Sequence, residues 1–330
     1  MKKPSPLVEI SGTGRFLPDH VVTNDELART LDTSDEWIRT RTGIRERRVA
    51  PREMTAAEMG SISARKAMEE AGVEPGEVDI LIVSTATPDR LLPSTACDVQ
   101  AILGCSNAVA FDLSAACTGF LYGLSMSEGY LTAGRGDVAL VVSTEKMSAI
   151  LDWEDRSTAV LFGDGSASAV LRRSDGRRGI LSSHLRSDGN LAELLYRPAG
   201  GAMEPMSEEV VAGRRHLMRM EGREIFKNAV RSMAEGCDAA LQQAGLTSDD
   251  IALLVPHQAN IRIIQSTAKY AGIPMERVYL NVDRYGNMSS ASLPVALDEA
   301  REEGRIQEGD YVLAVAFGAG LTWGALTMRW

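Results

Sequence analysis

The stretch FDLSAACTGFLYGL, residues 111–124, changes from a strand-like apolar segment through small residues to a helical pattern. Cys117 lies at this junction, where small neighbours allow a sharp turn and the close approach of a ligand. Free N–H groups and the dipole at a helix N-terminus favour a thiolate. Most intracellular cysteines, however, are small core residues. Cys117 is therefore either inert packing or an activated nucleophile at a strand-to-helix turn.

The composition is that of an ordinary soluble globular protein of about two domains, with 44% apolar and 24% charged residues among 330. The net charge of −10 disfavours nucleic-acid binding, because nucleic-acid binders usually have a basic balance. The N-terminal MKKPSPLVEI has two lysines but no apolar segment behind them, so it does not resemble a signal peptide. No apolar run reaches the roughly 18 residues of a membrane span. We expect a soluble, cytoplasmic protein that binds neither membrane nor nucleic acid.

The four cysteines show no sign of a metal site or a disulfide framework. They form no C-x-x-C pair, and no histidine lies at a metal-ligand spacing from them. We therefore expect no metal, and free thiols that are mostly buried, with Cys97, Cys105 and Cys237 as core residues.

Strand-like and helix-like segments alternate along the chain, which predicts an α/β fold with mainly parallel sheets. Apolar runs predict strands at 78–86, 108–114, 137–145, 158–173, 251–256, 277–282, 310–320 and 321–330. Helical patterns lie at 55–72, 119–134, 222–245 and 291–304. The segment 158–173 is similar to 313–330, and 66–84 is similar to 239–256. We interpret these similarities as two copies of one α/β unit, 1–175 and 176–330, with a join near 175–215.

Three further segments could contribute polar groups to a site. His257 follows the apolar run 251–256, at the edge where parallel sheets bind ligands, although a lone histidine is usually structural. Asn287 lies between Gly286 and a run of small residues, either as a turn residue or as an amide directed into a pocket. The glycine-rich FGAGLTWG, residues 317–324, could offer a backbone N–H to an oxyanion.

With these motifs in order, the chain resembles the thiolase-fold condensing enzymes, and within them the β-ketoacyl-acyl-carrier-protein synthase III family. The resemblance covers nearly the whole chain, through DTSDEWIRTRTGIRERR, AACTGF, DRSTAVLFGDGSASAVL, VPHQANIRI, NVDRYGNMSSASLPVAL and FGAGLTWG. It implies a five-layered αβαβα fold of two duplicated α/β halves. It also implies a catalytic set of Cys117 from the first half with His257 and Asn287 from the second. A thiolase would have a second catalytic cysteine, and an elongating synthase a second histidine in place of Asn287; neither is present.

The reaction that the resemblance implies is a decarboxylative Claisen condensation that initiates type II fatty-acid synthesis. An acyl-CoA primer, acetyl or short and branched, reacts with malonyl-acyl-carrier-protein to give 3-oxoacyl-acyl-carrier-protein, CoA and CO₂. Acyl-CoA is a substrate, and no cofactor is implied. The expected assembly is a homodimer.

The resemblance assigns roles to further residues. The backbone N–H groups of Cys117 and Ala319 would form the oxyanion site, although some relatives have glycine at the second position. The expected CoA-binding residues are Thr33, Trp37, Arg41, Arg156, Phe226 and Asn260. Leu92 would close the acyl pocket across the dimer, in a loop that departs from the family pattern. The expected docking residues for the acidic carrier protein are Arg262, Lys227 and Lys269, for which a solvated surface is nearly as good an explanation.

Two alternatives stay open at this point. One is a related Cys–His–Asn condensing enzyme of polyketide or quinolone-type secondary metabolism. The other is a non-catalytic thiolase-fold subunit that only binds acyl chains. Such subunits usually lose the nucleophile, whereas Cys117, His257 and Asn287 are all present.

Overall fold

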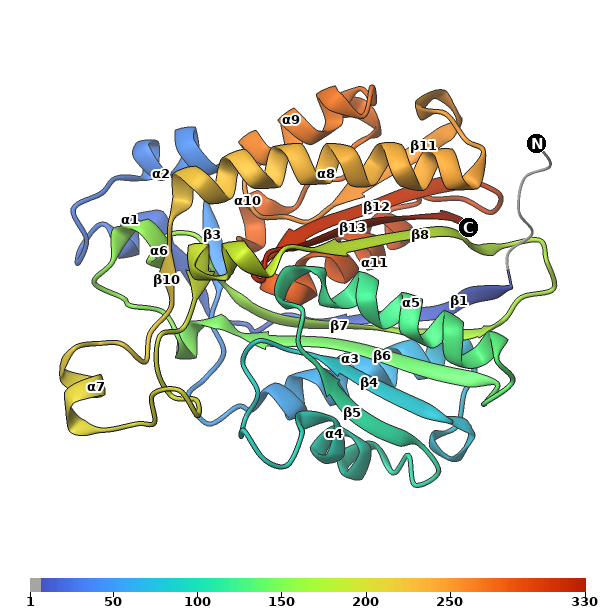
Figure 1. Cartoon of the computed structure of the whole chain (residues 1–330), viewed down its shortest axis with the longest axis horizontal. Coiled ribbons are helices and arrows are strands. Elements are labelled where there is room, and N and C mark those ends of the chain that lie inside the picture. Colours follow the sequence, from blue (N-terminus) through green and yellow to red (C-terminus); the bar gives the residue numbers. More distant parts are fainter. Residues whose placement is uncertain (1–6) are drawn as a thin grey trace.

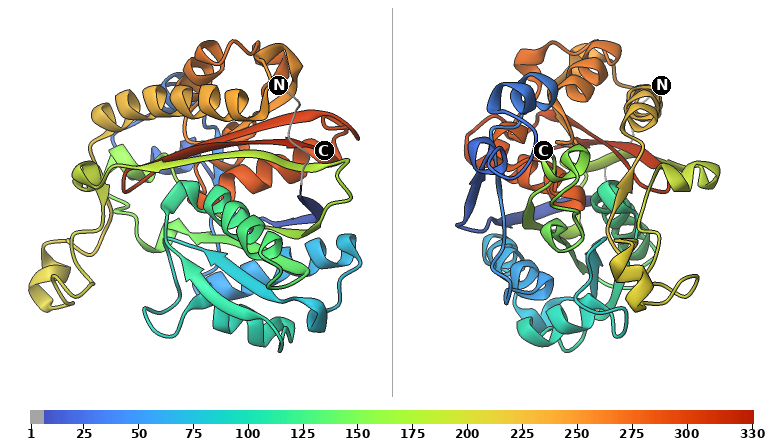
Figure 2. Two further views of the ribbon diagram at one scale, coloured as in Figure 1. Left: turned by 45° about the vertical axis from the view of Figure 1, so that its right-hand side comes forward. Right: turned by 90° about the vertical axis from the view of Figure 1, so that its left-hand side faces the viewer.

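Two β-sheets lie face to face, with helices between them and on both outer sides (Figure 1). The computed structural model describes residues 7–330, so the first six residues, with the two lysines noted above, lie outside the described residues. Across the molecule the layers are helix, strand, helix, strand and helix (Figure 2). This arrangement confirms the predicted five-layered αβαβα fold.

The first sheet has the strand order β1-β7-β6-β4-β5. Its strands are β1 (Val8–Phe16), β4 (Ile80–Ser84), β5 (Val109–Leu113), β6 (Val138–Lys146) and β7 (Asp164–Arg173). β4 pairs in parallel with β5 and β6, whereas β7 is antiparallel to β1 and β6. The inner strands are continuous apolar runs because helices cover both of their faces. β5 is an edge strand, and its residues are more exposed than those of β4 and β6.

The second sheet has the order β11-β12-β13-β8. Its strands are β8 (Gly179–Ser187), β11 (Ile251–Pro256), β12 (Tyr311–Gly318) and β13 (Thr322–Arg329). β11 and β12 are parallel, and the other pairs are antiparallel. β8 lies inside the segment 175–215 that the sequence suggested as a join, so that description is wrong for 179–187. The alternating residues Ile180, Ser182 and His184 are buried, a strand pattern hidden by the polar residue types.

Helices form the other three layers (Figures 1 and 2). The outer helices on the first sheet are α3 (Ala56–Ala71) and α4 (Thr95–Leu103), and those on the second are α8 (Gly222–Ala244) and α9 (Ile261–Tyr270). The middle layer is α5 (Gly119–Thr132) and α11 (Ser292–Glu302). Thr55 and Glu58 form a capping box that starts α3, and Gly72 ends it with φ +60°. Among residues 7–330, none of the helices has both the length and the apolar character needed to span a membrane.

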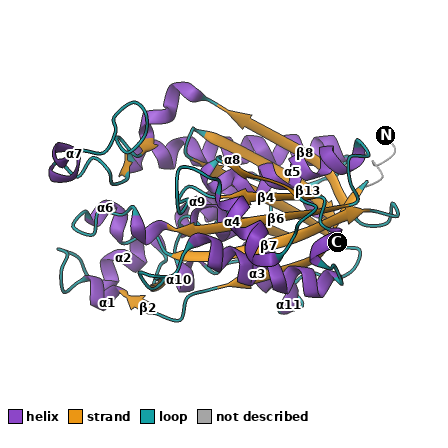
Figure 3. Ribbon diagram, turned by 90° about the horizontal axis from the view of Figure 1, so that it is seen from below, coloured by secondary structure: helices purple, strands orange, loops and turns teal. Residues whose placement is uncertain are grey.

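Short elements surround the ends of the sheets. They are β2 (Val21–Thr23), α1 (Asn24–Leu27), α2 (Asp35–Thr42), β3 (Glu46–Arg48), α6 (Arg156–Ala159), β9 (Leu195–Tyr196), α7 (Glu208–Ala212), β10 (Arg219–Met220) and α10 (Val282–Tyr285). α7 lies in a connecting segment that projects from the body of the molecule in both views (Figures 1 and 3).

Two predicted strands are wholly or partly absent. The segment 158–173 begins in the helix α6, and its strand β7 starts only at Asp164. The helix forms here because Asp155 caps its N-terminus, where the carboxylate accepts the Ser157 N–H at 2.8 Å. The segment 277–282 forms only an isolated bridge to β11. Its end is drawn out of the sheet because Gln258 Oε1 accepts the N–H groups of residues 281 and 282 at 3.0 and 3.1 Å.

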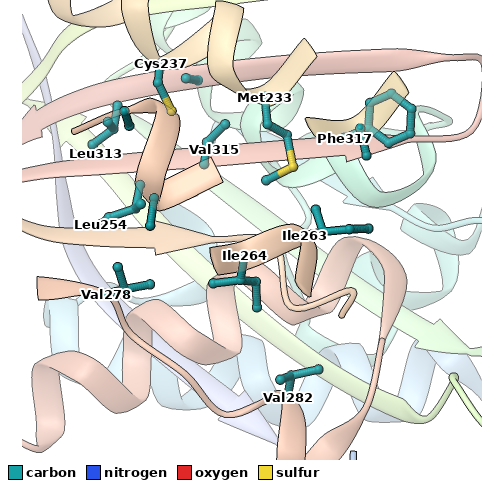
Figure 4. Packing of buried hydrophobic residues seen from close by; sticks show 14 of the residues in the cluster. Met233, Cys237, Leu254, Ile263, Ile264, Val278, Val282, Leu313, Val315 and Phe317 are labelled. Carbon is teal, nitrogen blue, oxygen red and sulfur yellow. The ribbon is translucent and has the colours of Figure 1, made fainter. Parts of the chain in front are cut away.

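The largest apolar cluster lies between α8, α9 and the second sheet (Figure 4). Cys237 and Leu313 are completely buried in it, and each fully buried side chain of leucine size contributes about 1.5–3 kcal/mol. Cys105 is buried in the first half, as predicted. Cys97 is exposed, so its assignment to the core is wrong. The buried positions of α4 are Thr95, Ala96, Val99 and Leu103, and the turn of the helix places residue 97 on the other side, facing outward.

Candidate active site

Cys117 lies at a strained turn between β5 and α5. A single 3₁₀ turn, Ala116–Thr118, separates the strand from the helix. Ala116 has φ +44°, a left-handed conformation that costs a non-glycine residue on the order of 1–3 kcal/mol. Gly119 begins α5, and a Cβ atom there would lie only 1.8 Å from Ser84 Oγ. The sequence therefore permits a close turn that directs the thiol toward the second half of the chain.

Burial keeps the Cys117 thiol protonated. It raises the pKa of the thiol from 9.0 to about 12, and the nearby charge of Glu145 acts in the same direction. This rise corresponds to about 4 kcal/mol. A helix N-terminus contributes at most about 2 kcal/mol to an anion, which does not offset it. The thiolate expected from the sequence is therefore not the resting form, and the proton must leave as the sulfur reacts.

His257 directly follows β11, and its N–H continues the sheet by donating to Val315 O at 2.8 Å. The side chain is buried, and neither ring nitrogen has a hydrogen-bond partner among the described residues. Burial lowers the pKa of the imidazole to about 3, so the ring is neutral at neutral pH. An unpaired buried donor costs about 1–3 kcal/mol, which indicates a group that bonds to a ligand rather than to the protein.

Asn287 is held by backbone bonds from the first half of the chain. Its N–H donates to Leu161 O at 2.8 Å, and its carbonyl accepts the Gly163 N–H at 3.0 Å. Gly163 is needed there because a Cβ atom would lie 2.6 Å from Tyr285 O. The side-chain Oδ1 accepts the Ser289 N–H at 2.8 Å. The amide is thereby oriented, and its two N–H donors are left for a ligand.

These three side chains line one cavity of about 110 Å³. Phe226 and Asn260, two of the residues expected at CoA, line it as well. Most of the remaining wall is apolar, and none of these side chains was predicted as part of a site. They are Leu161, Phe162, Leu195, Met220, Ile225, Ala229, Met233, Ile263 and Phe317. Three of these residues, labelled in Figure 4, belong to the cluster under α8. The four-residue spacing of 225, 229 and 233 was a usable helical signal.

Gly318 brings the end of β12 against the nucleophile. It lines the cavity, and a Cβ atom on it would lie 2.7 Å from the backbone nitrogen of Cys117. Ala319 follows in the turn to β13, where its carbonyl accepts the Thr322 hydroxyl at 3.0 Å. The two backbone segments expected to form an oxyanion site are therefore neighbours.

The remaining residues expected at CoA form a cluster beside the cavity. The guanidinium carbons of Arg41 and Arg156 each lie 4.7 Å from the centroid of the Trp37 ring. An aromatic base stacked between Trp37 and Arg156 needs a separation of roughly 7 Å between the ring and the guanidinium. The guanidinium of Arg156 must therefore move away from Trp37 before a base can bind there. Asn260 links the cluster to the cavity, since its Nδ2 donates to Arg41 O at 3.1 Å. The Thr33 hydroxyl is buried and without a partner among residues 7–330.

The expected lid and docking residues lie on the surface. Leu92 is 86% exposed and does not line the cavity. The guanidinium of Arg262 lies 5.5 Å from the Phe226 ring centroid, so it caps a cavity wall. Lys227 has an ion pair with Glu224 at 3.8 Å, and the exposed Lys269 is in the last turn of α9.

No cluster of three or more histidine, cysteine, aspartate or glutamate side chains in the described part of the chain could hold a metal ion. A larger cavity of about 200 Å³ lies between β1 and β8, and none of the predicted site residues lines it.

Two family models match the chain. Residues 111–189 match 3-oxoacyl-[acyl-carrier-protein] synthase III, and residues 241–330 match the C-terminal model of the same family. A protein of Symbiobacterium thermophilum described as β-ketoacyl-[acyl-carrier-protein] synthase III is 52% identical over 323 residues, 98% of each chain. One of Caldanaerobacter subterraneus with the same description is 47% identical over 321 residues, 97% of each chain.

Solved structures agree with these relatives. The crystal structure of 3-oxoacyl-[acyl-carrier-protein] synthase III from Aquifex aeolicus has a TM-score of 0.91 at 45% identity, with 98% of this chain and 100% of that chain covered. The priming β-ketosynthase of the R1128 polyketide pathway has a TM-score of 0.90 at 36% identity, with 100% and 97% covered. With a cysteine, a histidine and an asparagine around one cavity of this fold, the chain belongs to the β-ketoacyl-acyl-carrier-protein synthase III family of condensing acyltransferases.

Proposed function

We propose that this chain condenses an acyl-CoA primer with malonyl-acyl-carrier-protein, releasing CoA and CO₂ and forming 3-oxoacyl-acyl-carrier-protein. This is the initiating step of type II fatty-acid synthesis. The observation that carries the proposal is the single cavity to which one half of the chain contributes Cys117 and the other half contributes His257 and Asn287. The reaction needs no metal or organic cofactor, because acyl-CoA brings its own activated thioester.

In the first stage Cys117 Sγ attacks the thioester carbonyl of the primer. The backbone N–H groups of Cys117 and Ala319 stabilise the tetrahedral oxyanion, CoA leaves, and the acyl group stays on the sulfur. The apolar wall suits this acyl chain. The cavity of about 110 Å³ is smaller than the roughly 150 Å³ that holds benzene, so short primers are favoured.

In the second stage the malonyl thioester loses CO₂, and negative charge develops on its thioester oxygen. His257 is neutral and Asn287 presents amide N–H groups, so both can donate hydrogen bonds to that oxygen. The resulting carbanion then attacks the acyl group on Cys117. A single oxyanion donor is typically worth roughly 3–4 kcal/mol, or about 10²–10³ in rate.

The primer's CoA lies, in this proposal, across the cluster beside the cavity, with its pantetheine arm past Thr33, Phe226 and Asn260. The guanidinium of Arg156 moves away from Trp37, and the adenine stacks between these two side chains. Arg41 binds the phosphates. Guanidinium stacking on an aromatic ring and bonding to phosphate both favour arginine in these positions.

The carrier protein docks, in this proposal, on the exposed basic residues around the entrance, Arg262, Lys227 and Lys269. The enzyme has a net charge of −10, so an acidic partner needs such a local positive surface. Arg262 is the strongest of the three because it also contacts Phe226 in the cavity wall.

We further propose a cytoplasmic homodimer built on the edge strand β5. Val109 is 55% and Phe111 39% exposed there, on a strand whose outer backbone edge has no partner strand in the described chain. Such an edge is a natural pairing surface. In such a dimer, Leu92 of one subunit would cover the cavity of the other subunit. We propose a boundary between the two halves at 175/176, a position in the connection from β7 to β8.

The test is a reconstitution with purified protein, acetyl-CoA and malonyl-acyl-carrier-protein. We expect 3-oxobutanoyl-acyl-carrier-protein and CO₂, and none with Cys117→Ser. Condensation with malonyl-CoA but not with malonyl-acyl-carrier-protein would instead favour a polyketide or quinolone-type enzyme. Acyl binding without any product would favour a non-catalytic subunit.

A further inference from the structure

Arg47, in the short strand β3, carries a completely buried guanidinium that the steps above do not use. No carboxylate pairs with it among residues 7–330, and the adjacent Glu46 lies 3.9 Å from the guanidinium of Arg48 instead. The hydrogen bonds of Arg47 go to neutral oxygens, which are Val22 O at 3.0 Å, Asn24 Oδ1 at 2.9 Å and Val160 O at 2.9 Å. Burial lowers the pKa of the guanidinium to about 10, so it is still charged at neutral pH. A buried charge without a counter-ion is costly to keep, which indicates a role beyond packing.

Asn24 connects Arg47 with the helix α2. The Asn24 side chain is buried, and its Oδ1 accepts a hydrogen bond from Arg47 Nη2. Its Nδ2 donates to the Asp35 carboxylate at 2.9 Å and to Ile44 O at 2.8 Å. Both ends of the amide are bonded, so its orientation is fixed. Asp35 is the first residue of α2, the helix that carries Trp37, and the start of this helix is therefore tied to Arg47.

Val160 connects Arg47 with the helix α6. It directly follows this helix, and its carbonyl accepts a hydrogen bond from the same Nη2 atom that binds Asn24. Arg156 is the first residue of α6, and its guanidinium carbon lies 4.7 Å from the centroid of the Trp37 ring. The N–H bonds of a guanidinium have fixed directions in one plane. A single nitrogen of Arg47 therefore fixes how α2 and α6 lie relative to each other.

These two helices need such an external support because they are short. α2 has 8 residues and α6 has 4, whereas isolated helices shorter than about 12–15 residues are marginal in water. The guanidinium of Arg156 must move away from Trp37 to admit a base. The base is then held between them only if the backbones of the two helices keep their separation. The bonds of Arg47 to both helices supply this constraint.

We propose that Arg47 is a positioning residue for the CoA primer, which holds α2 and α6 at the separation at which Trp37 and Arg156 bind the adenine between them. Arg47 does not line the cavity, and its complete burial separates it from the substrate. The inference rests on the proposed function and deepens its CoA site. It confines the effect of Arg47 to the adenine end of the primer, so the surroundings of the acyl group and the donors for decarboxylation stay as they are.

The test compares acylation of the enzyme by acetyl-CoA with acylation by acetyl-pantetheine, which lacks the adenine nucleotide. Arg47→Lys keeps the charge and most of the stem, but an ammonium group lacks the planar fork that bonds to both helices. The acetyl-CoA concentration that gives half the maximal rate should rise about tenfold, the scale of one stacking contact, whereas that of acetyl-pantetheine should change less than about twofold. The maximal rates should stay close to native with both thioesters.

Two further variants make the comparison specific. Arg48→Lys is the matched control, because this arginine lies in the same strand but bonds to the backbone carbonyls of residues 18 and 19 at 3.4 and 3.5 Å. It should leave the use of both thioesters unchanged. Asn24→Asp keeps the shape and an acceptor for Arg47, and it adds a counter-charge, but it removes the donor to Asp35. This variant should reproduce the loss that is selective for acetyl-CoA.

Equal losses with the two thioesters in Arg47→Lys and Asn24→Asp would overturn the inference, because they would indicate a general structural role. Native use of acetyl-CoA in both variants would overturn it as well, and so would an equal selective loss in Arg48→Lys. If Arg47→Lys does not fold, Asn24→Asp, which keeps the guanidinium, decides between these results. If the native enzyme uses both thioesters equally well, the adenine is not recognised, and the inference fails while the proposed function stands. If neither thioester acylates the native enzyme, the proposed function itself fails.

Discussion

Replacing Asn287 with aspartate tests the division of labour in the cavity. The two side chains have nearly the same shape, and a carboxylate would still accept the Ser289 N–H that Oδ1 now accepts at 2.8 Å. The backbone bonds to Leu161 and Gly163 do not involve the side chain. The substitution therefore removes the N–H donors and leaves an acceptor that repels the forming enolate. Losing one such donor costs roughly 3–4 kcal/mol, so decarboxylation should fall at least about 10²–10³-fold.

The assay follows the two half-reactions separately. Release of labelled CO₂ from malonyl-acyl-carrier-protein measures decarboxylation, and transfer from labelled acetyl-CoA to protein measures acylation. Acylation should stay within about tenfold of the native rate, because Asn287 plays no part in that step. Asn107→Asp, an exposed asparagine outside the cavity, is the isosteric control and should change neither rate. Equal loss of both half-reactions, or undiminished decarboxylation, would refute the assignment.

Four further outcomes are expected. Cys117→Ser should abolish acyl-enzyme formation in intact-protein mass spectra; a persistent adduct would mean another nucleophile. The folded-state pKa of His257, about 3, lies below the ordinary 6.5, so its contribution to stability is complete above pH 6.5 and is lost as the pH falls toward 3. When the pH is lowered from 7 to 5, the free energy of unfolding, measured in urea, should fall in the native protein by about 2 kcal/mol more than in His257→Gln. An equal fall in both proteins would contradict the buried neutral ring. Arg262→Glu should raise the KM for malonyl-acyl-carrier-protein about tenfold with little change in acetyl-CoA acylation; an unchanged KM would place docking elsewhere. Phe111→Lys should shift sedimentation from dimer toward monomer, and an intact dimer would exclude the β5 edge as the interface.

Much of the architecture could be predicted because it depends on patterns that are local in sequence. Alternating apolar runs and helical periods locate most strands and helices of both sheets, and the similar halves indicate two facing layers. The turn at Cys117 was also readable, because only small residues permit that backbone path. The sequence pattern fails for segments whose hydrogen-bond partners are distant in the sequence. Residues 277–282 look like a strand, but bonds from Gln258 divert their end into α10.

The electrostatics of the site could not be predicted in the same way. The helix N-terminus at Cys117 is visible in the sequence, whereas the closure of the cavity around it is a tertiary property. That closure keeps the thiol protonated and His257 neutral. The Ser289 hydroxyl lies in a run of small polar residues with no distinguishing neighbour. Only the fold shows that it accepts a hydrogen bond from Cys117 Sγ at 3.7 Å.

The most direct measurement of the central claim is peptide mapping of the enzyme by mass spectrometry after a pulse of acyl-CoA and a chase of malonyl-acyl-carrier-protein. The account predicts that the acyl group appears on the peptide containing Cys117 alone and disappears during the chase as 3-oxoacyl-acyl-carrier-protein accumulates. An acyl group on another residue, or one on Cys117 that survives the chase without product, would contradict it.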